Sequence, residues 1–370
     1  MTNEHDEAPD RAPVRVAWFV SNHGWGHLSR STVIAEAFLR HGHAVLMVVA
    51  PEMEQAVRAA LPGGAIEVVT GDLDRGYAFG AGGRGADAER SRELIRYGTS
   101  VDPAVLEAVQ AWAPDVLASD ATPWASRVAG ALSVPSVICS NFSWDDQYAS
   151  LFEGHADVAA EVEIVREHVA AFTLALELPL GPGIPATPKR RAVPLVSRWP
   201  SDAPVSDVLP VGKGELITWA FGRTPLAEQP LEGLQRLVEL AKARGLRVGA
   251  TAATAEAVPG VVAIPDDGYW PDVLAASRLV VSKAGYSTLA EALRGRAHLI
   301  VFGITGLPEE RGMVRAVEAV GYGLAIPLES SDPASGVEAH ANALLDRPRR
   351  DAVTENGTAA IVDEVVRLVR

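Results

Sequence analysis

Short runs of apolar residues recur along the chain, and each is followed by a segment with helical spacing. Residues 14–20 form a run that is apolar except for Arg15, a glycine-containing loop follows at 21–26, and a helical pattern extends over about 29–40. A strand that is apolar on both faces belongs to a parallel sheet with helices on either side. The pattern therefore predicts an α/β fold built on parallel sheets.

The same alternation occurs twice, which predicts two Rossmann-like domains. A segment rich in proline and glycine, residues 178–214, separates the two halves and is expected to form loop and linker. With 370 residues and 48% hydrophobic content, the chain can fill two cores. The expected strands are 14–20, 44–49, 115–119 and 134–138 in the first half, and 216–220, 247–250, 261–264, 279–281, 299–302 and 324–326 in the second. The expected parts are a disordered tail (1–13), an N-terminal Rossmann-like domain (14–195), a linker (196–213), a C-terminal Rossmann-like domain (214–348) and a C-terminal helix (349–370).

Composition excludes several classes of protein. A formal net charge of -14 argues against nonspecific binding to nucleic acid. The single cysteine, Cys139, rules out an internal disulfide and a zinc site of the Cys type. The start of the chain does not look like a signal peptide, and no segment approaches about 18 uninterrupted apolar residues. We therefore expect a cytoplasmic protein without a membrane segment, and the histidine spacing indicates no metal site.

One loop of the second half has the features of a nucleotide-binding site. Gly285 follows the strand 279–281, and Ser287 and Thr288 stand at the start of the next helix. Unpaired N–H groups and the helix dipole make such an end a site for a diphosphate. Glu291 lies one turn further along the same face, where its carboxylate can accept hydrogen bonds from a ribose. The alternative is that Ser287 caps the helix and Glu291 is a solvated acid.

A loop of the first half has the features of a catalytic site. Gly24 and Gly26 allow a tight turn directly after the first strand, and His27 lies near the helix start, where the positive field favours a neutral imidazole. Such a group can take a proton from a hydroxyl. Asp120, after the strand 115–119, lies at the same sheet edge and can orient the ring. The alternative is a structural histidine. The loop does not match the dinucleotide-binding pattern Gly-x-Gly-x-x-Gly, because Ser29 stands where the third glycine belongs.

Two further loops follow strands and are expected at the cleft. Arg223, after the strand 216–220, is a candidate phosphate ligand, although it can equally be a surface cation. Asn141, Trp144 and Asp145 follow the strand 134–138 and combine a stacking ring with polar groups suited to sugar hydroxyls, which makes them candidates for acceptor binding.

The residues 282–291 (Ser-Lys-Ala-Gly-Tyr-Ser-Thr-Leu-Ala-Glu) resemble the donor-binding signature of GT-B glycosyltransferases related to the N-acetylglucosaminyltransferase of peptidoglycan synthesis. They are more similar still to the glycosyltransferase-like amino-terminal region of L-arabinokinase. The similarity continues through 297–302, 307–311 and 318–321. It implies two Rossmann-like domains with parallel sheets facing a cleft, that is, a GT-B fold.

The resemblance also implies roles for individual residues. It assigns acceptor binding to the N-terminal domain (14–195) and nucleotide-sugar binding to the C-terminal domain (214–348). It places Gly285 and Thr288 by the phosphates, Glu291 on the ribose, and the loop of Glu309 and Glu310 at the sugar. Gly24, Gly26 and Ser282 are also counted among the donor-binding candidates. The bacterial transferase usually has glutamines in place of these two glutamates, which leaves the sugar open. The loop 266–270 corresponds to one that brackets the base.

The loop that contains Gly24, Gly26 and His27 resembles the histidine loop of inverting GT-B enzymes, in which the histidine faces the acceptor. The segment 114–120 resembles the strand and aspartate of the same enzymes. The expected function is therefore inverting, metal-independent transfer of a sugar from a nucleotide-diphosphate sugar, UDP-linked by resemblance, to a hydroxyl of a small or lipid-linked acceptor. The nucleotide sugar is a co-substrate, and no cofactor is expected. A UDP-sugar hydrolase, which shares the Gly-x-Gly-His-x-x-Arg pattern, and a nonenzymatic nucleotide-sugar-binding module are the alternatives.

Overall fold

The computed structural model describes residues 12–61, 66–83, 85–201, 209, 211–212, 214–222, 224–266, 268–351 and 353–369. The expected tail falls mostly on residues outside these ranges, and so does part of the expected linker. None of the described helices is both long enough and apolar enough to cross a lipid bilayer.

The first half contains a parallel sheet of seven strands in the order β3-β2-β1-β6-β7-β8-β9. Its central strands are buried on both faces, in keeping with their largely apolar sequences. The strands are β1 (Arg15–Val20), β2 (Ala44–Val49), β3 (Ile66–Thr70), β6 (Val116–Asp120), β7 (Ser136–Ser140), β8 (Leu174–Glu177) and β9 (Arg190–Ala192). A short antiparallel hairpin, β4 (Ala78–Phe79) and β5 (Ala86–Asp87), stands apart from this sheet.

The second half contains a parallel sheet of six strands in the order β12-β11-β10-β13-β14-β15. In each sheet the first strand in the sequence, β1 or β10, lies in the interior, and the later strands are added on both sides of it. This is the pattern of doubly wound nucleotide-binding folds. The strands are β10 (Leu216–Ala220), β11 (Arg247–Thr251), β12 (Val261–Ile264), β13 (Ser277–Lys283), β14 (His298–Phe302) and β15 (Gly323–Ile326).

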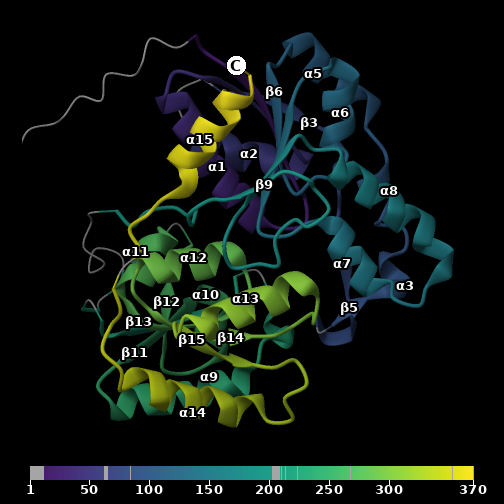
Figure 1. Cartoon of the computed structure of the whole chain (residues 1–370). Helices are drawn as coiled ribbons and strands as arrows, with labels where there is room; N and C mark the ends of the chain where they lie inside the picture. Colours follow the sequence, from purple (N-terminus) through teal and green to yellow (C-terminus); the bar gives the residue numbers. More distant parts are fainter. Residues whose placement is uncertain are drawn as a thin grey trace, which may run out of the picture.

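Helices cover both faces of each sheet (Figure 1). In the first half these are α1 (Trp25–Arg40), α2 (Glu54–Ala60), α3 (Ala88–Ser91), α4 (Arg96–Thr99), α5 (Pro103–Trp112), α6 (Ala125–Leu132), α7 (Trp144–Leu151) and α8 (Ala159–Ala170). In the second half they are α9 (Leu231–Ala243), α10 (Ala252–Ala257), α11 (Trp270–Ala276), α12 (Tyr286–Arg294), α13 (Pro308–Ala319) and α14 (Pro333–Leu345). The last helix, α15 (Gly357–Leu368), returns to the first half and packs beside α1 (Figure 1).

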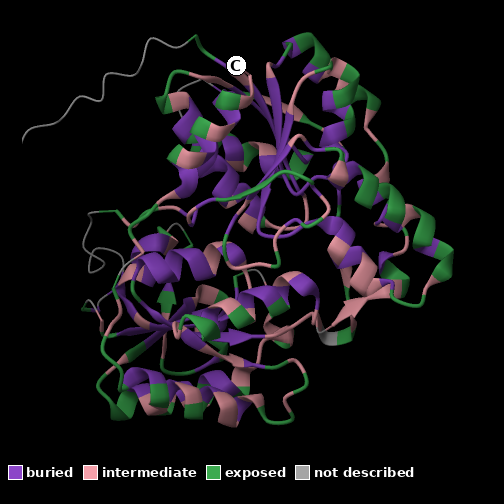
Figure 2. Cartoon of the chain, in the orientation of Figure 1, coloured by how far each residue is buried: buried purple, intermediate pink, exposed green. Residues whose placement is uncertain are grey.

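The buried residues concentrate in the sheets and on the inner faces of the helices (Figure 2). One apolar cluster extends without a break through both halves, because Leu195 and Val196 of the crossing segment pack with Tyr286 and Leu289 of α12. The halves therefore share part of their core.

The chain passes from one half to the other twice, at about residues 195–198 (the first crossing) and 353–355 (the second crossing). Arg294 of α12 forms hydrogen bonds with both. Its guanidinium donates to the carbonyl of Leu195 and to Ser197 in the first crossing. It also donates to the carbonyls of Val353 and Glu355 in the second crossing. One side chain thus fastens both crossings to the helix that follows β13.

The sequence-based prediction was right about the parallel sheets and wrong about several elements. Helix α1 begins at Trp25, about four residues earlier than predicted. The strands β3 and β8 were missed, and β9 lies inside the segment that was predicted to be loop. Strand β9 is an edge strand whose residues are all exposed, so it lacks the apolar signal that marks a central strand.

Candidate functional site

The predicted site residues lie where the strand order of each sheet reverses. Strand β1 is flanked by β2 and β6, and β10 is flanked by β11 and β13, so the reversal points lie between β1 and β6 and between β10 and β13. Ligands of open α/β sheets bind outside the carboxyl ends of the strands at such points. His27 follows β1, Asp120 ends β6, and Gly285 follows β13.

His27 and Asp120 form a buried pair. The Nδ1 atom of His27 lies 2.9 Å from Oδ1 of Asp120. The imidazole is 8% exposed, and the carboxylate is not exposed at all. Burial by itself raises the pKa of Asp120, but Arg30 and His27 outweigh it and hold that pKa at about 2. Asp120 is therefore an ionised hydrogen-bond acceptor at neutral pH.

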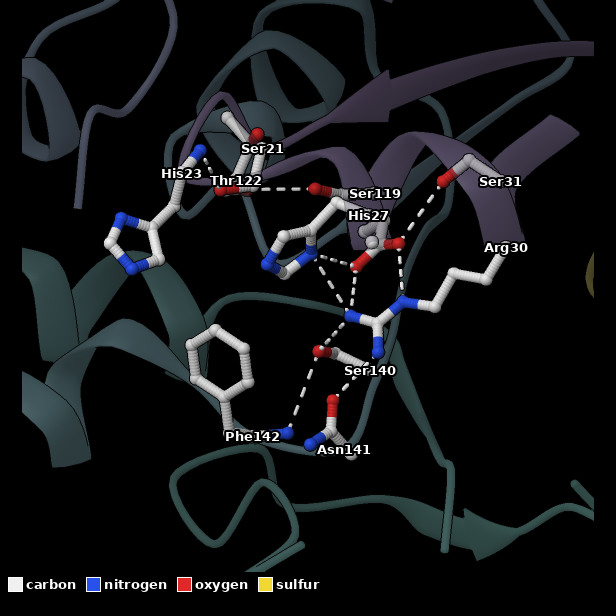
Figure 3. Close-up of polar contacts among 12 residues, drawn as sticks. Ser21, His23, His27, Arg30, Ser31, Ser119, Thr122, Ser140, Asn141 and Phe142 are labelled. Atoms are coloured by element: carbon white, nitrogen blue, oxygen red, sulfur yellow. Dashed lines mark hydrogen bonds and ion pairs between the residues drawn. The ribbon is translucent and has the colours of Figure 1, made fainter. Parts of the chain in front are cut away.

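Two groups contact Nδ1 of His27. Oδ1 of Asp120, at 2.9 Å, can only accept a hydrogen bond, and Nη2 of Arg30, at 3.0 Å, can only donate one, so a neutral imidazole serves one of the two contacts. In the tautomer that donates to Asp120 the proton is on Nδ1, and the other ring nitrogen, Nε2, keeps its lone pair. Figure 3 shows this nitrogen turned away from Arg30 and Ser140, on the side of Phe142. The arrangement leaves Nε2 able to accept a proton from a bound hydroxyl.

Arg30 is a buried cation at the centre of the same network (Figure 3). Its Nε donates to Oδ2 of Asp120 at 2.6 Å, and its Nη2 donates to Oδ1 at 2.5 Å. Further hydrogen bonds reach Ser140 at 3.0 Å and Asn141 at 2.7 Å. Burial alone would lower the pKa of Arg30, but the charge of Asp120 raises it well above the ordinary value.

A pocket of about 480 Å³ opens between the halves, and Gly26 and Leu28, the chain neighbours of His27, line it, whereas His27, Arg30 and Asp120 themselves do not. Four of the predicted donor-binding residues line it, namely Gly26, Ser287, Thr288 and Glu291. Trp270, from the loop expected to bracket the base, lines it as well. The volume falls in the range of pockets that hold small molecules.

Two helix N-termini meet at this pocket. Gly24 is the N-cap of α1 and Gly285 is the N-cap of α12, and neither supplies a side-chain acceptor for the first turn. The hydroxyl of Ser287 donates to the carbonyl of Gly26 at 2.9 Å, which joins the two helix ends. Unpaired N–H groups and two positive helix ends favour an anion here.

The glycines of the first loop differ from the prediction. Gly24 is extended, with φ of 177°, and Gly26 lies within the first turn of α1, so they do not form a glycine-dependent tight turn. An added Cβ at Gly26 would lie 3.5 Å from Oγ of Ser287, an ordinary van der Waals contact, so the approach to Ser287 does not require glycine either. Ser287 is not the N-cap of its helix, since its hydroxyl bonds across to the other half.

The side chain of Glu291 is 3% exposed and is paired with Arg198 of the first crossing. Nε of Arg198 lies 2.7 Å from Oε1, and Nη2 lies 3.2 Å from Oε2. Burial raises the pKa of Glu291, and Arg198 acts against this rise. Arg198 also lines the pocket.

Glu309 connects the second half to the histidine network. Its Oε1 accepts a hydrogen bond from Nδ2 of Asn141 at 3.0 Å, and its backbone N–H donates to Gln147 at 3.2 Å. Burial raises the pKa of Glu309, and the neighbouring His27 and Asn141 oppose the rise. Glu309 and the predicted acceptor residue Asn141 are thus brought together with His27.

Other predicted residues are placed differently. The carboxylate of Glu310 accepts hydrogen bonds from the backbone amides of residues 304–306, at 2.7–2.9 Å, and so holds its own loop. Trp144 is fully buried and Asp145 is 4% exposed, so neither presents an open face to an acceptor. Ser282 is buried at the end of β13 and does not line the pocket. Arg223 lies outside the described residues.

Sequence reasoning missed two charged residues of the site. Arg30 lies three positions after His27, and this spacing on one helix face is the signal that was available. Arg198 lies in a proline-rich crossing and has no local motif. Among the described residues, no group of three or more His, Cys, Asp and Glu side chains is arranged to hold a metal ion.

Comparison with known proteins supports the predicted fold. No family model matches the sequence. The chain is similar to L-arabinokinase of Arabidopsis thaliana, with 30% identity over 296 residues, covering 75% of this chain and 27% of that protein. The chain thus spans about a quarter of the length of this relative, and the predicted resemblance to it is confirmed.

Solved structures of glycosyltransferases have the same architecture. The calicheamicin glycosyltransferase CalG4 aligns with a TM-score of 0.68 at 18% identity, over 97% of this chain and 99% of its own. A UDP-glucosyltransferase from Polygonum tinctorium aligns with a TM-score of 0.65 at 12% identity, over 96% and 98% of the two chains. The chain therefore has the GT-B fold, as predicted. The narrower resemblance to the peptidoglycan enzyme stays a prediction.

Proposed function

We propose that this chain is an inverting glycosyltransferase that moves a sugar from a nucleoside-diphosphate sugar, with UDP as the first candidate nucleotide, to a hydroxyl of an acceptor. The observation that carries the proposal is the buried His27–Asp120 pair together with a pocket that is lined by Gly26 and Leu28, the chain neighbours of His27, by the first turn of α12 and by Glu291. The similarity of fold to a UDP-glucosyltransferase supports the choice of UDP.

The proposed reaction assigns one task to each side of the cleft. The diphosphate lies against the first turn of α12, and Glu291 accepts hydrogen bonds from the ribose. Nε2 of His27 takes the proton of the acceptor hydroxyl while its oxygen attacks the anomeric carbon from the side opposite the diphosphate. The bond between that carbon and the diphosphate oxygen breaks, and the electron pair leaves with the diphosphate. Asp120 stabilises the imidazolium that forms.

The first test separates donor binding from chemistry. His27→Ala is expected to retain the affinity for UDP and to lower turnover by about 10²- to 10⁴-fold, because a general base contributes about that much. Glu291→Ala is expected to weaken UDP binding about tenfold or more, because hydrogen bonds to a charged group are lost. Binding is measured by calorimetry, and turnover by nucleotide release from a panel of nucleotide sugars with a library of hydroxyl acceptors.

The matched control is His41→Ala, which removes an exposed histidine at the other end of α1. Loss of UDP binding in His27→Ala, or unchanged turnover, contradicts the assigned role. Equal nucleotide release with and without acceptors identifies a hydrolase instead. Binding of UDP without turnover on any donor and acceptor favours a binding module. Metal independence is tested in the same assay, where EDTA is expected to leave turnover unchanged.

A further inference from the structure

The first crossing between the halves is fixed along α12. The hydroxyl of Tyr286, the first residue of α12, accepts a hydrogen bond from the backbone N–H of Val196 at 3.2 Å. Arg294, the last residue of that helix, donates to Ser197 at 2.5 Å. Arg198 therefore emerges beside Glu291 from a segment that is held at both ends of the helix. Its position is set by the crossing and not by a flexible surface loop.

The pair of Arg198 and Glu291 has a two-pronged geometry. Separate nitrogens of the guanidinium contact separate oxygens of the carboxylate, at 2.7 and 3.2 Å. This contact fixes the plane of the carboxylate, because a bidentate pair permits little rotation. The ring of Tyr269 lies 5.5 Å from the guanidinium carbon of Arg198 and limits its movement on another side.

The carboxylate keeps acceptor capacity after this pairing. Two carboxylate oxygens offer about four lone-pair sites, and the two contacts with Arg198 use two of them. Glu291 and Arg198 both line the pocket, as does Thr288 one turn before Glu291. A carboxylate of fixed orientation with one free acceptor site on each oxygen matches two neighbouring hydroxyls of a sugar ring.

We propose that Arg198 is a positioning residue, which holds the Glu291 carboxylate so that the pocket selects ribonucleotides over 2′-deoxyribonucleotides. The inference rests on the proposed function, because it needs Glu291 to receive the ribose. It adds that the selection is supplied by the crossing segment and not by α12 alone. Removal of Arg198 leaves a buried carboxylate without its cation, which then protonates or rotates.

The experiment compares UDP with 2′-deoxy-UDP on the full chain. Wild type is expected to prefer UDP about tenfold, because one hydrogen bond to a charged group is missing in the deoxy compound. In Arg198→Met this preference is expected to fall to less than about threefold at pH 7, as in Glu291→Gln. The double variant is expected to resemble either single variant, since both act on one carboxylate. Binding is measured by calorimetry, and melting temperatures verify that each variant is folded.

A second readout depends on pH and does not follow from a merely structural role. Without Arg198, the pKa of Glu291, which burial raises, loses its main opposing influence. In Arg198→Met the preference for UDP is therefore expected to increase with pH as the carboxyl group ionises, and it is measured from pH 6 to pH 8.5. In wild type the preference is expected to stay constant over that range.

Arg236→Met is the matched control, because Arg236 pairs with Glu232 of α9, contacts Ser335 of α14 and does not line this pocket. It is expected to keep the wild-type preference. An unchanged preference in a folded Arg198→Met, or tighter UDP binding by that variant, overturns the inference alone. If wild type binds UDP, GDP and ADP no better than it binds phosphate, the proposed function fails together with the inference.

Discussion

At the scale of single residues, the site depends on buried charges that neutralise one another. Asp120 accepts hydrogen bonds from both His27 and Arg30, and Arg30 reaches Asn141, which in turn donates to Glu309. A buried charge without a partner costs several kcal/mol, so each member of this chain requires its neighbours. Asp120 and Arg30 thereby hold the imidazole of His27 in one orientation before any substrate arrives.

A neighbouring histidine makes the stability of the protein depend on pH. His23 packs against Tyr77 and Trp144, with ring centroids at 4.3 and 5.0 Å. Burial, with a further contribution from His27, lowers the pKa of His23 from 6.5 to about 3. Between these values the unfolded chain binds a proton that the folded chain does not. Stability is therefore expected to fall as the pH drops below 6.5, by at most about 1.4 kcal/mol per pH unit from this group.

His23→Gln is expected to flatten this dependence, as measured by urea unfolding at pH 7, 6 and 5. His41→Gln, at an exposed position, serves as the control and is expected to keep the wild-type slope. Identical slopes for wild type and His23→Gln would show that another group is responsible.

At the scale of elements, α15 completes a core to which it is not adjacent in the sequence. The helix follows the second half of the chain, but its buried face packs with α1 and with the first sheet. Ile361 is fully buried in that cluster. Ile361→Ala is expected to lower the free energy of unfolding by about 2 to 5 kcal/mol, because a cavity remains where the side chain was.

The measurement is urea unfolding, with Asp363→Ala on the exposed face of α15 as control. The affinity for UDP, measured below the unfolding transition, is expected to stay at the wild-type value. A loss of affinity without a loss of stability would place α15 in the site and would contradict its purely packing role.

The elements also show which parts of the fold a sequence reveals. Central strands such as β1 and β13 were predictable, because burial on both faces leaves a continuous apolar run. Strand β3, at a sheet edge, has a mixed burial pattern, and β9 is fully exposed, so neither carries that signal. His27 and Asp120 were found because they follow central strands. The loop-holding role of Glu310 was not, since only the backbone path of residues 304–306 reveals it.

At the scale of the whole molecule, the two halves meet tightly beside the pocket. Gly312 of α13 faces the backbone of Gly181 and Pro182 in the first half, where an added Cβ would come within 2.9 Å. Gly312→Val is therefore expected to hold the halves apart near Glu309 and Asn141. Turnover is expected to fall at least tenfold, because a displacement of about 1 Å can cost about 10²-fold in rate. UDP binding at α12 is expected to change less than threefold.

Ala319→Val provides the control, because Ala319 is exposed on the same helix. Turnover is measured with the donor and acceptor identified for the wild type, and UDP affinity by calorimetry. Full turnover in a folded Gly312→Val would mean that the close approach of the halves at this point is not needed for the reaction.

The hydrogen bonds of Arg294 to both crossings have a consequence for protein engineering. Arg294 of α12 forms hydrogen bonds with Leu195 and Ser197 in one connecting segment and with Val353 and Glu355 in the other. Both connecting segments are therefore held in place by the second half. A chimera that combines this second half with the first half of a relative should be cut before Leu195, and should carry the chain through Glu355 from the same parent. A cut at the start of β10 would instead pair Arg294 with foreign connectors and remove Arg198 from its glutamate.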